Sequence, residues 1–154
     1  MRITSEFVGL EELQKRIVLI GGDQLLRDTN KKIIKEGQKR GGELAKPSLP
    51  KSADHSGSGP KRKSDSDRKT PPGHAADHIP IGQIQTFRKA YVSGTIGWTP
   101  GDIGEYFYEK FPIYGVPGHI EEQVGFEQVQ DNVQRFIDRM GREAYLKLLK
   151  EALE

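Results

Sequence analysis

The sequence has no cysteine among its 154 residues, and only 34% of them are hydrophobic. Without cysteine there is no disulfide, no thiolate metal site and no cysteine nucleophile. No apolar run approaches the roughly 18–20 residues that a membrane-spanning helix needs. The first 30 residues contain acids and lack an apolar block with a cleavage site, so we expect no signal peptide. The length fits a single domain.

The shortage of apolar residues is concentrated between Pro47 and Gly73. These 27 residues contain two hydrophobic side chains, Leu49 and Ala53, and five of the nine prolines. They cannot bury enough apolar surface to offset their ordering entropy, so we predict one domain, 1–154, with a mobile loop at 47–73. Three roles stay open for this loop: a solvated loop, a segment that orders on assembly, or a contact to DNA or an acidic partner through Lys61, Arg62, Lys63, Arg68 and Lys69.

Charge is distributed unevenly along the chain. The formal net charge is +2, but residues 1–73 sum to +6 and residues 74–154 to −4. Such asymmetry favours either a charged partner or subunits that pack front against back. A solvated surface with chance asymmetry is the third interpretation.

The first third of the chain predicts a strand followed by a helix. Residues 2–8 alternate in polarity, with Ile3, Ser5 and Phe7 on one face. An amphipathic helix follows, with its apolar face formed by Leu10, Leu13, Ile17 and Ile20. Gly21 and Gly22 interrupt it, and a second segment runs to about Lys46, where Pro47 ends it. Gly37 and Gly41 lie on the apolar side of this segment, which indicates that a sheet or another helix passes close to them.

The last third predicts strands and then a long helix. Candidate strands are 84–88, 91–98 and 106–111, with a turn at 88–90 between the first two. From about Glu121, apolar residues at spacings of three and four predict a helix longer than the domain's own core requires. Gly141 is a candidate break, after which the last turns would fold back or project to a neighbour. The predicted fold is α+β: a small antiparallel sheet of three or four strands packed with an N-terminal and a long C-terminal helix.

Little in the sequence indicates catalysis. His74, Asp77 and His78 form a metal-like cluster, but Pro72 and Pro80 leave no room for a stable helix there, and no fourth ligand is evident. The alternative is that these residues anchor the loop where it re-enters the fold. There is no serine nucleophile elbow and no phosphate-binding loop. We therefore expect a protein that is not an enzyme, with no catalytic residue, metal or cofactor.

The aromatic residues between 98 and 114 have acidic rather than basic neighbours, which argues against a base-stacking platform. We predict that they serve the core and a subunit interface. The candidate interface residues, including two from the last helix, are Tyr106, Tyr108, Phe111, Tyr114, Phe136 and Met140.

Several local motifs resemble the small tail-component proteins of tailed phages and prophages. The first is F-V-G-L-E-E-L at residues 7–13, a strand, a glycine and a helix start. The second is the A-K-P exit from the helix at residues 45–47. The third is A-D-H-I-P at residues 76–80, followed by G-T-I-G-W at 94–98 and Y-F-Y-E-K-F at 106–111. Residues 112–118 depart from the family's usual turn, so the contacts of that turn do not carry over.

The resemblance implies a structural role in the virion. Such proteins form rings, commonly hexamers, that complete the tail and join it to the head connector. The implied partners are copies of the chain itself, the tail-tube protein, the head-connector and neck proteins, and DNA in the lumen, with no membrane. The implied location is the neck of the particle, assembled in the host bacterial cytoplasm. The alternative function is a DNA-binding accessory protein that acts through the basic loop 47–73.

Overall fold

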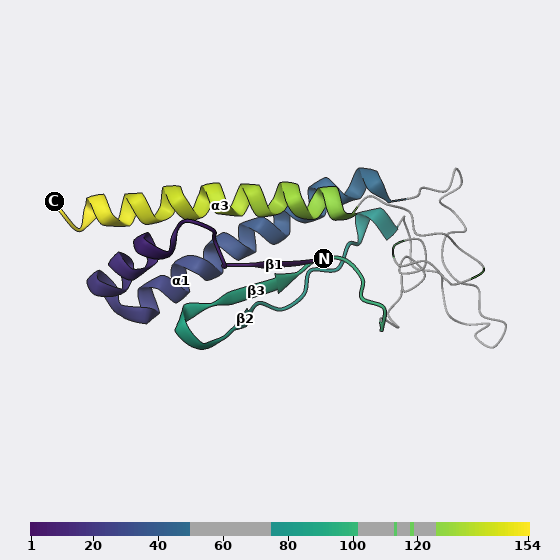
Figure 1. The fold of residues 1–154 in the computed structure, drawn as a ribbon. Coiled ribbons are helices and arrows are strands. Elements are labelled where there is room, and N and C mark those ends of the chain that lie inside the picture. Colours follow the sequence, from purple (N-terminus) through teal and green to yellow (C-terminus); the bar gives the residue numbers. More distant parts are fainter. Residues whose placement is uncertain (50–74, 102–112, 114–117, 119–125) are drawn as a thin grey trace.

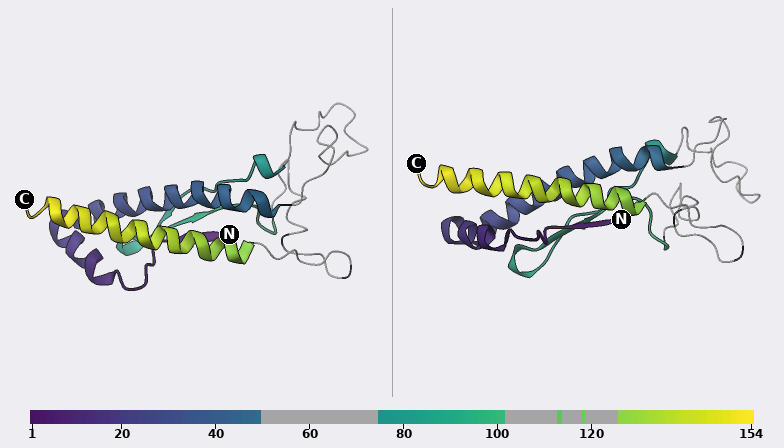
Figure 2. Two further views of the ribbon diagram at one scale, coloured as in Figure 1. Left: turned by 90° about the horizontal axis from the view of Figure 1, so that it is seen from above. Right: turned by 45° about the horizontal axis from the view of Figure 1, so that its top comes forward.

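The computed structural model describes residues 1–49, 75–101, 113, 118 and 126–154. Along the chain these residues form β1 (Arg2–Thr4), α1 (Glu11–Ala45), β2 (Gln85–Thr86), β3 (Val92–Thr95) and α3 (Phe126–Glu151). The two long helices lie side by side and cover one face of the sheet (Figures 1 and 2). The predicted α+β architecture is therefore confirmed.

The sheet is antiparallel and has the strand order β1-β3-β2. Ile3 pairs with Gly94 on one side of β3, and Thr86 pairs with Val92 on the other. All three strands lie where the alternation predicted them but are shorter than predicted. The 3₁₀ turn between β2 and β3, at Arg88–Ala90, also lies where it was predicted. The predicted strand 106–111 falls outside the described residues.

Helix α1 is bent at Gly22, whose φ of 70° and ψ of −178° are not helical. Only glycine adopts this conformation readily, since a Cβ would clash with the backbone there. The predicted interruption at Gly21 and Gly22 is thus confirmed. The prediction for Ile20 is wrong: this side chain is 47% exposed, because it lies beside the bend rather than over the core.

Gly37 and Gly41 lie where three elements meet. A Cβ on Gly37 would collide with Ile137 of α3 and lie 2.9 Å from Ile3 of β1. A Cβ on Gly41 would collide with Ile96 and lie 3.4 Å from Val133 of α3. The predicted close approach is confirmed, and both a helix and the sheet make it. Gly37 meets Ile137, whereas Gly41, further along α1, meets Val133, which comes earlier in α3. The two helices are therefore antiparallel.

Helix α3 continues through Gly141, so the predicted break there is wrong. Phe7 and Leu10 pack over this glycine, with side-chain atoms 3.0 Å and 3.3 Å from where its Cβ would lie. The missing side chain makes room for the segment between β1 and α1. The length of α3 is used within the chain, because its 26 residues pack along α1, which has 35 residues.

Helices α1 and α3 together form the helix layer, and the main core lies between this layer and the sheet. Its largest fully buried apolar residues come from β1, α1, β3, α3 and the residues next to them. They are Ile3, Leu10, Ile17, Ile34, Val92, Ile96, Val133, Ile137 and Tyr145. At about 25 cal/mol per Å² of apolar surface, this burial is the main stabilising contribution to the fold. No helix in the part of the chain that the structure describes is long and apolar enough to cross a bilayer.

Candidate functional site

Three segments that are far apart in the sequence meet in a second, smaller apolar cluster. Leu49, Ala76 and Trp98 are 4%, 2% and 3% exposed and contact one another. Leu49 follows the 3₁₀ turn that ends α1, Ala76 lies in a second 3₁₀ turn at Ala75–Asp77, and Trp98 follows β3. We call these three residues the motif cluster, because Ala76 and Trp98 lie in motifs that carry the resemblance and Leu49 lies two residues after the A-K-P motif.

An ion pair reinforces the motif cluster. Lys46 Nζ, in the A-K-P motif, pairs with the Asp77 carboxylate of the A-D-H-I-P motif, and both side chains are about half exposed. A pair of this exposure contributes little by itself, about 0–1 kcal/mol. Its position is informative, however, because it joins the two segments that lie immediately before and after residues 50–74.

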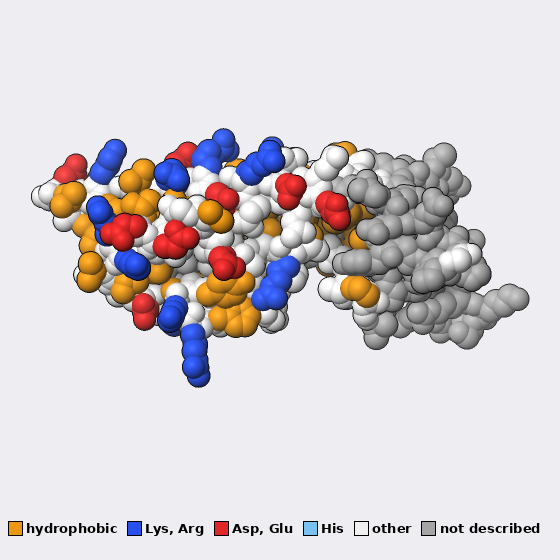
Figure 3. All heavy atoms as spheres, in the orientation of Figure 1, with side chains coloured by type: hydrophobic (Ala, Val, Ile, Leu, Met, Phe, Trp, Pro, Cys, Tyr) orange, Lys and Arg blue, Asp and Glu red, His pale blue; other side chains and the backbone are white. Residues whose placement is uncertain are grey.

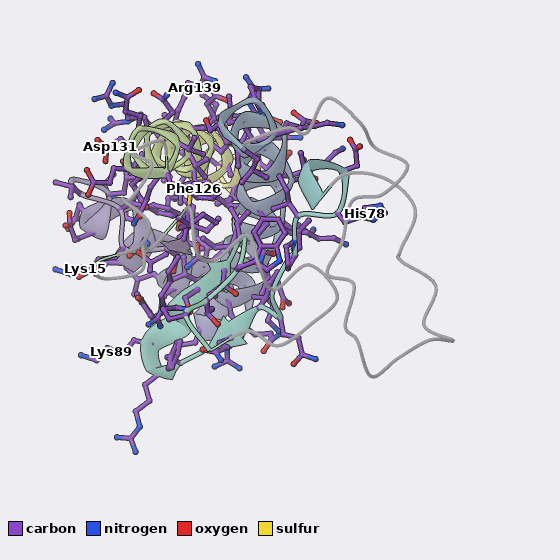
Figure 4. All side chains as sticks on the ribbon, turned by 90° about the vertical axis from the view of Figure 1, so that its right-hand side faces the viewer. Lys15, His78, Lys89, Phe126, Asp131 and Arg139 are labelled. Atoms are coloured by element: carbon purple, nitrogen blue, oxygen red, sulfur yellow. The ribbon has the colours of Figure 1, made fainter. Side chains whose placement is uncertain are left out.

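The metal-like cluster is divided between described and undescribed parts of the chain. Asp77 is engaged by Lys46, His78 is exposed and projects away from the helices (Figure 4), and His74 lies outside the described residues. Within 1–49, 75–101 and 126–154, no three His, Asp or Glu side chains are placed to share a metal ion. The placement of Asp77 supports the anchoring role.

A buried hydrogen-bond network links α3 to α1 and to the turn between β2 and β3. The Tyr145 hydroxyl, in a fully buried side chain, donates to Asn30 Oδ1 and accepts from Gln14 Nε2 at 3.1 Å. Asn30 Nδ2 in turn donates to the Ala90 carbonyl oxygen at 3.0 Å. Burial raises the pKa of Tyr145 to about 12, although both side-chain hydrogen bonds act in the opposite direction. At neutral pH the hydroxyl is therefore a fixed neutral donor.

A second buried amide attaches α1 to the sheet. Gln38 is 2% exposed, and its Nε2 donates to the carbonyl oxygens of Gly82 at 2.8 Å and Thr95 at 3.0 Å. Gly94 gives the amide room, since a Cβ there would lie 2.7 Å from it. Gln38 thus pairs with two backbone carbonyl groups, as buried polar side chains generally do, and so fixes α1 against the sheet.

Most of the predicted site residues lie outside the described residues. This applies to the loop residues Lys61, Arg62, Lys63, Arg68 and Lys69 and to the aromatics Tyr106, Tyr108, Phe111 and Tyr114. Phe136 and Met140 are described, and both are partly buried against the main core. The structure thus places these two at the edge of the core of a single chain.

The polar residues of the core were not predicted from the sequence. Asn30, Gln38 and Tyr145 occupy positions that fit the apolar stripes of α1 and α3, and each is at most 2% exposed. Tyr145 comes four residues after Gly141 and eight after Ile137, so its spacing already placed it on the buried face. A polar residue within an apolar stripe is the signal that was available.

The geometry defines an α+β protein in which the buried side chains of Tyr145, Asn30 and Gln38 connect the elements. No protein-family model, curated protein or solved structure matches the chain.

Proposed function

We propose that this chain is a structural virion protein of the neck of a tailed phage, prophage or tail-like particle. Copies of it form a ring, hexameric by the resemblance, that completes the tail and joins it to the head connector. It catalyses no reaction and needs no cofactor in this role.

The observation that carries the proposal is the motif cluster. Segments separated by some 20 to 50 residues in the sequence come together, with Leu49, Ala76 and Trp98 in one buried cluster and Lys46 paired with Asp77. Short strings resemble one another by chance easily, but strings that also pack together form one structural unit. Contact between the motifs therefore supports the resemblance on which the proposed function rests.

Light scattering of the purified full-length chain tests the ring. We expect a mass that rises with protein concentration, or assembly when purified tail tubes are added. Mass spectrometry of purified particles is expected to detect the chain in tails. A chain that is a single copy at every concentration, with and without tubes, and that is absent from particles would contradict the proposal.

The DNA-binding alternative has its own measurement. Affinity for a DNA duplex that depends on the basic segment should fall steeply between about 50 and 200 mM salt. Because Leu49 belongs to the motif cluster, the segment removed for this test is 51–73, replaced by a short glycine linker. If removal abolishes DNA binding and leaves assembly intact, the segment binds DNA independently of the ring.

A further inference from the structure

The helix layer carries opposite charges on its two flanks. On α1, Lys31, Lys35 and Lys39 are exposed and four residues apart, so they lie on one face; we call them the lysine row. On α3, residues Glu127 and Asp131 are exposed and Asp138 is partly buried. Their spacings of four and seven also place them on one face, and we call them the acidic row.

The contacts of α1 fix the direction of the lysine row. Gly37 faces α3 through Ile137, and Gln38 faces the sheet through Gly82 and Thr95. Each residue turns the helix by about 100° in the same sense. Lys39, the next residue, therefore lies on the flank of α1 that is turned away from α3, and Lys35 shares that flank.

The acidic row lies on the opposite flank of the layer. Ile137 faces α1, and Asp138 follows it by about 100° on the side away from α1. Asp131 points away from α1, whereas Arg139 projects from the top of the layer, away from the sheet (Figure 4). Acidic side chains also gather over the flank of α3 that faces the viewer, with basic side chains along its upper edge (Figure 3).

Among the described residues no member of either row forms an ion pair, although Arg135 and Arg142 lie one turn after Asp131 and Asp138. The ion pairs in this part of the chain join Arg16 to Glu12, Arg40 to Glu43, Lys46 to Asp77 and Lys147 to Glu151. Asp28, beside the start of the lysine row, accepts hydrogen bonds from Gln24, and Asp138 accepts one from Gln134.

Like charges four residues apart destabilise a helix. The lysine row repeats this spacing twice, and the acidic row contains it once, between Glu127 and Asp131. Contact between rows of opposite sign offsets that repulsion. Within one copy the helix layer separates the two rows, so the contact requires a second copy.

We propose that the lysine row of one copy docks against the acidic row of a second copy. The two surfaces differ and lie on opposite flanks, so every copy in such a contact leaves one row free for the next. This is the heterologous arrangement that closes into a ring. The inference rests on the proposed ring and adds the surfaces that form it, their orientation and a dependence on salt.

Paired charge reversals in the full-length chain test the docking. Lys35→Glu with Lys39→Glu gives a chain with two acidic flanks, and Glu127→Lys with Asp131→Lys gives one with two basic flanks. Each is expected to sediment as a single copy at about 50 mM salt, where screening is weak. Mixed in equal amounts, they are expected to regain the wild-type mass, because each reversed flank then meets its complement in an alternating ring.

The matched control for the lysine-row reversal is Arg139→Glu with Lys150→Glu, which lowers the net charge by the same amount on the exposed outer face of α3. It is expected to retain the wild-type mass, and circular dichroism checks that every variant is folded.

A wild-type mass for either reversed pair alone, or no recovery on mixing, would overturn the docking while leaving the ring itself standing. If Lys35→Glu with Lys39→Glu keeps the oligomer but loses binding to a short DNA duplex, the lysine row is a nucleic-acid surface and the docking is equally overturned. A wild-type chain that never assembles contradicts the proposed function itself.

Discussion

At the scale of single residues, Tyr145 is the most consequential polar group of the core. Tyr145→Phe removes a hydroxyl that donates to Asn30 and accepts from Gln14, and it leaves the Asn30 oxygen buried without that donor. Unpaired buried groups cost about 1–3 kcal/mol, so we expect this loss in the free energy of unfolding by denaturant. Tyr91→Phe is the control, because Tyr91 is only partly buried and packs against Phe87 by its ring. Equal losses for both variants would contradict the role of the network.

The raised pKa of Tyr145 predicts how stability depends on alkaline pH. Its folded-state pKa is about 12, above the ordinary value of 10.0, so folding favours the protonated hydroxyl. This contribution is complete below pH 10 and is lost as the pH rises from 10 towards 12, by at most about 1.4 kcal/mol for each pH unit. Wild-type and Tyr145→Phe chains unfolded in parallel isolate it from other tyrosines and lysines. The stability difference should shrink over that range, and a constant difference would count against the shift.

At the scale of elements, alanine substitutions at two glycines of α1 distinguish the effect of packing from the effect of helix propensity. Gly37→Ala places a methyl group against Ile137 and Ile3, and overpacking costs about 1–3 kcal/mol. That loss exceeds the gain of about 1 kcal/mol from replacing a helical glycine. We therefore expect Gly37→Ala to lower the thermal midpoint.

Gly42→Ala is the control in the same helix. No atom outside the immediate helix backbone lies within 4 Å of the added Cβ, so only the gain in helix propensity acts and the midpoint should rise. A rise for both variants would show that Ile137 and Ile3 move aside at little cost.

The same glycines show how far the sequence could predict the fold. Periodicity placed both helices and the three described strands, since burial of one face dictates spacing. The close-packing argument made for Gly37 and Gly41 applies equally to Gly141, where only the helix-breaking argument was considered. Local propensity alone misled there, because Phe7 and Leu10 supply the packing from a distant segment.

The candidate site was less predictable than the elements. The buried cluster of Leu49, Ala76 and Trp98 and the ion pair of Lys46 with Asp77 join segments that no local pattern relates. Likewise, the four-residue spacing of the lysine row is visible in the sequence. The side of α1 on which the row lies follows only from the contacts of Gly37 and Gln38. Sequence patterns predict which residues share a face, whereas the partner of that face depends on tertiary packing.

At the scale of the whole molecule, we expect the main core and the motif cluster to unfold as one cooperative unit. Ile79 and Phe126 pack against both of them, so neither can loosen without exposing apolar surface of the other. Trp98 is the only tryptophan, and it reports the state of the motif cluster, whereas far-UV circular dichroism reports the two long helices.

We expect the fluorescence and circular-dichroism transitions in denaturant to coincide, as two-state unfolding requires. Leu49→Ala removes a buried side chain from the motif cluster, so we expect the free energy of unfolding to fall by about 2–5 kcal/mol. The fluorescence and circular-dichroism midpoints should both move to lower denaturant concentration. Leu19→Ala, at a side chain that is 86% exposed, should stay within about 0.5 kcal/mol of wild type. A fluorescence transition that precedes the loss of helix, in wild type or in Leu49→Ala, would mean that the motif cluster unfolds separately. The motifs would then be adjacent without being part of the same cooperative structure as the helices that carry the two charged rows.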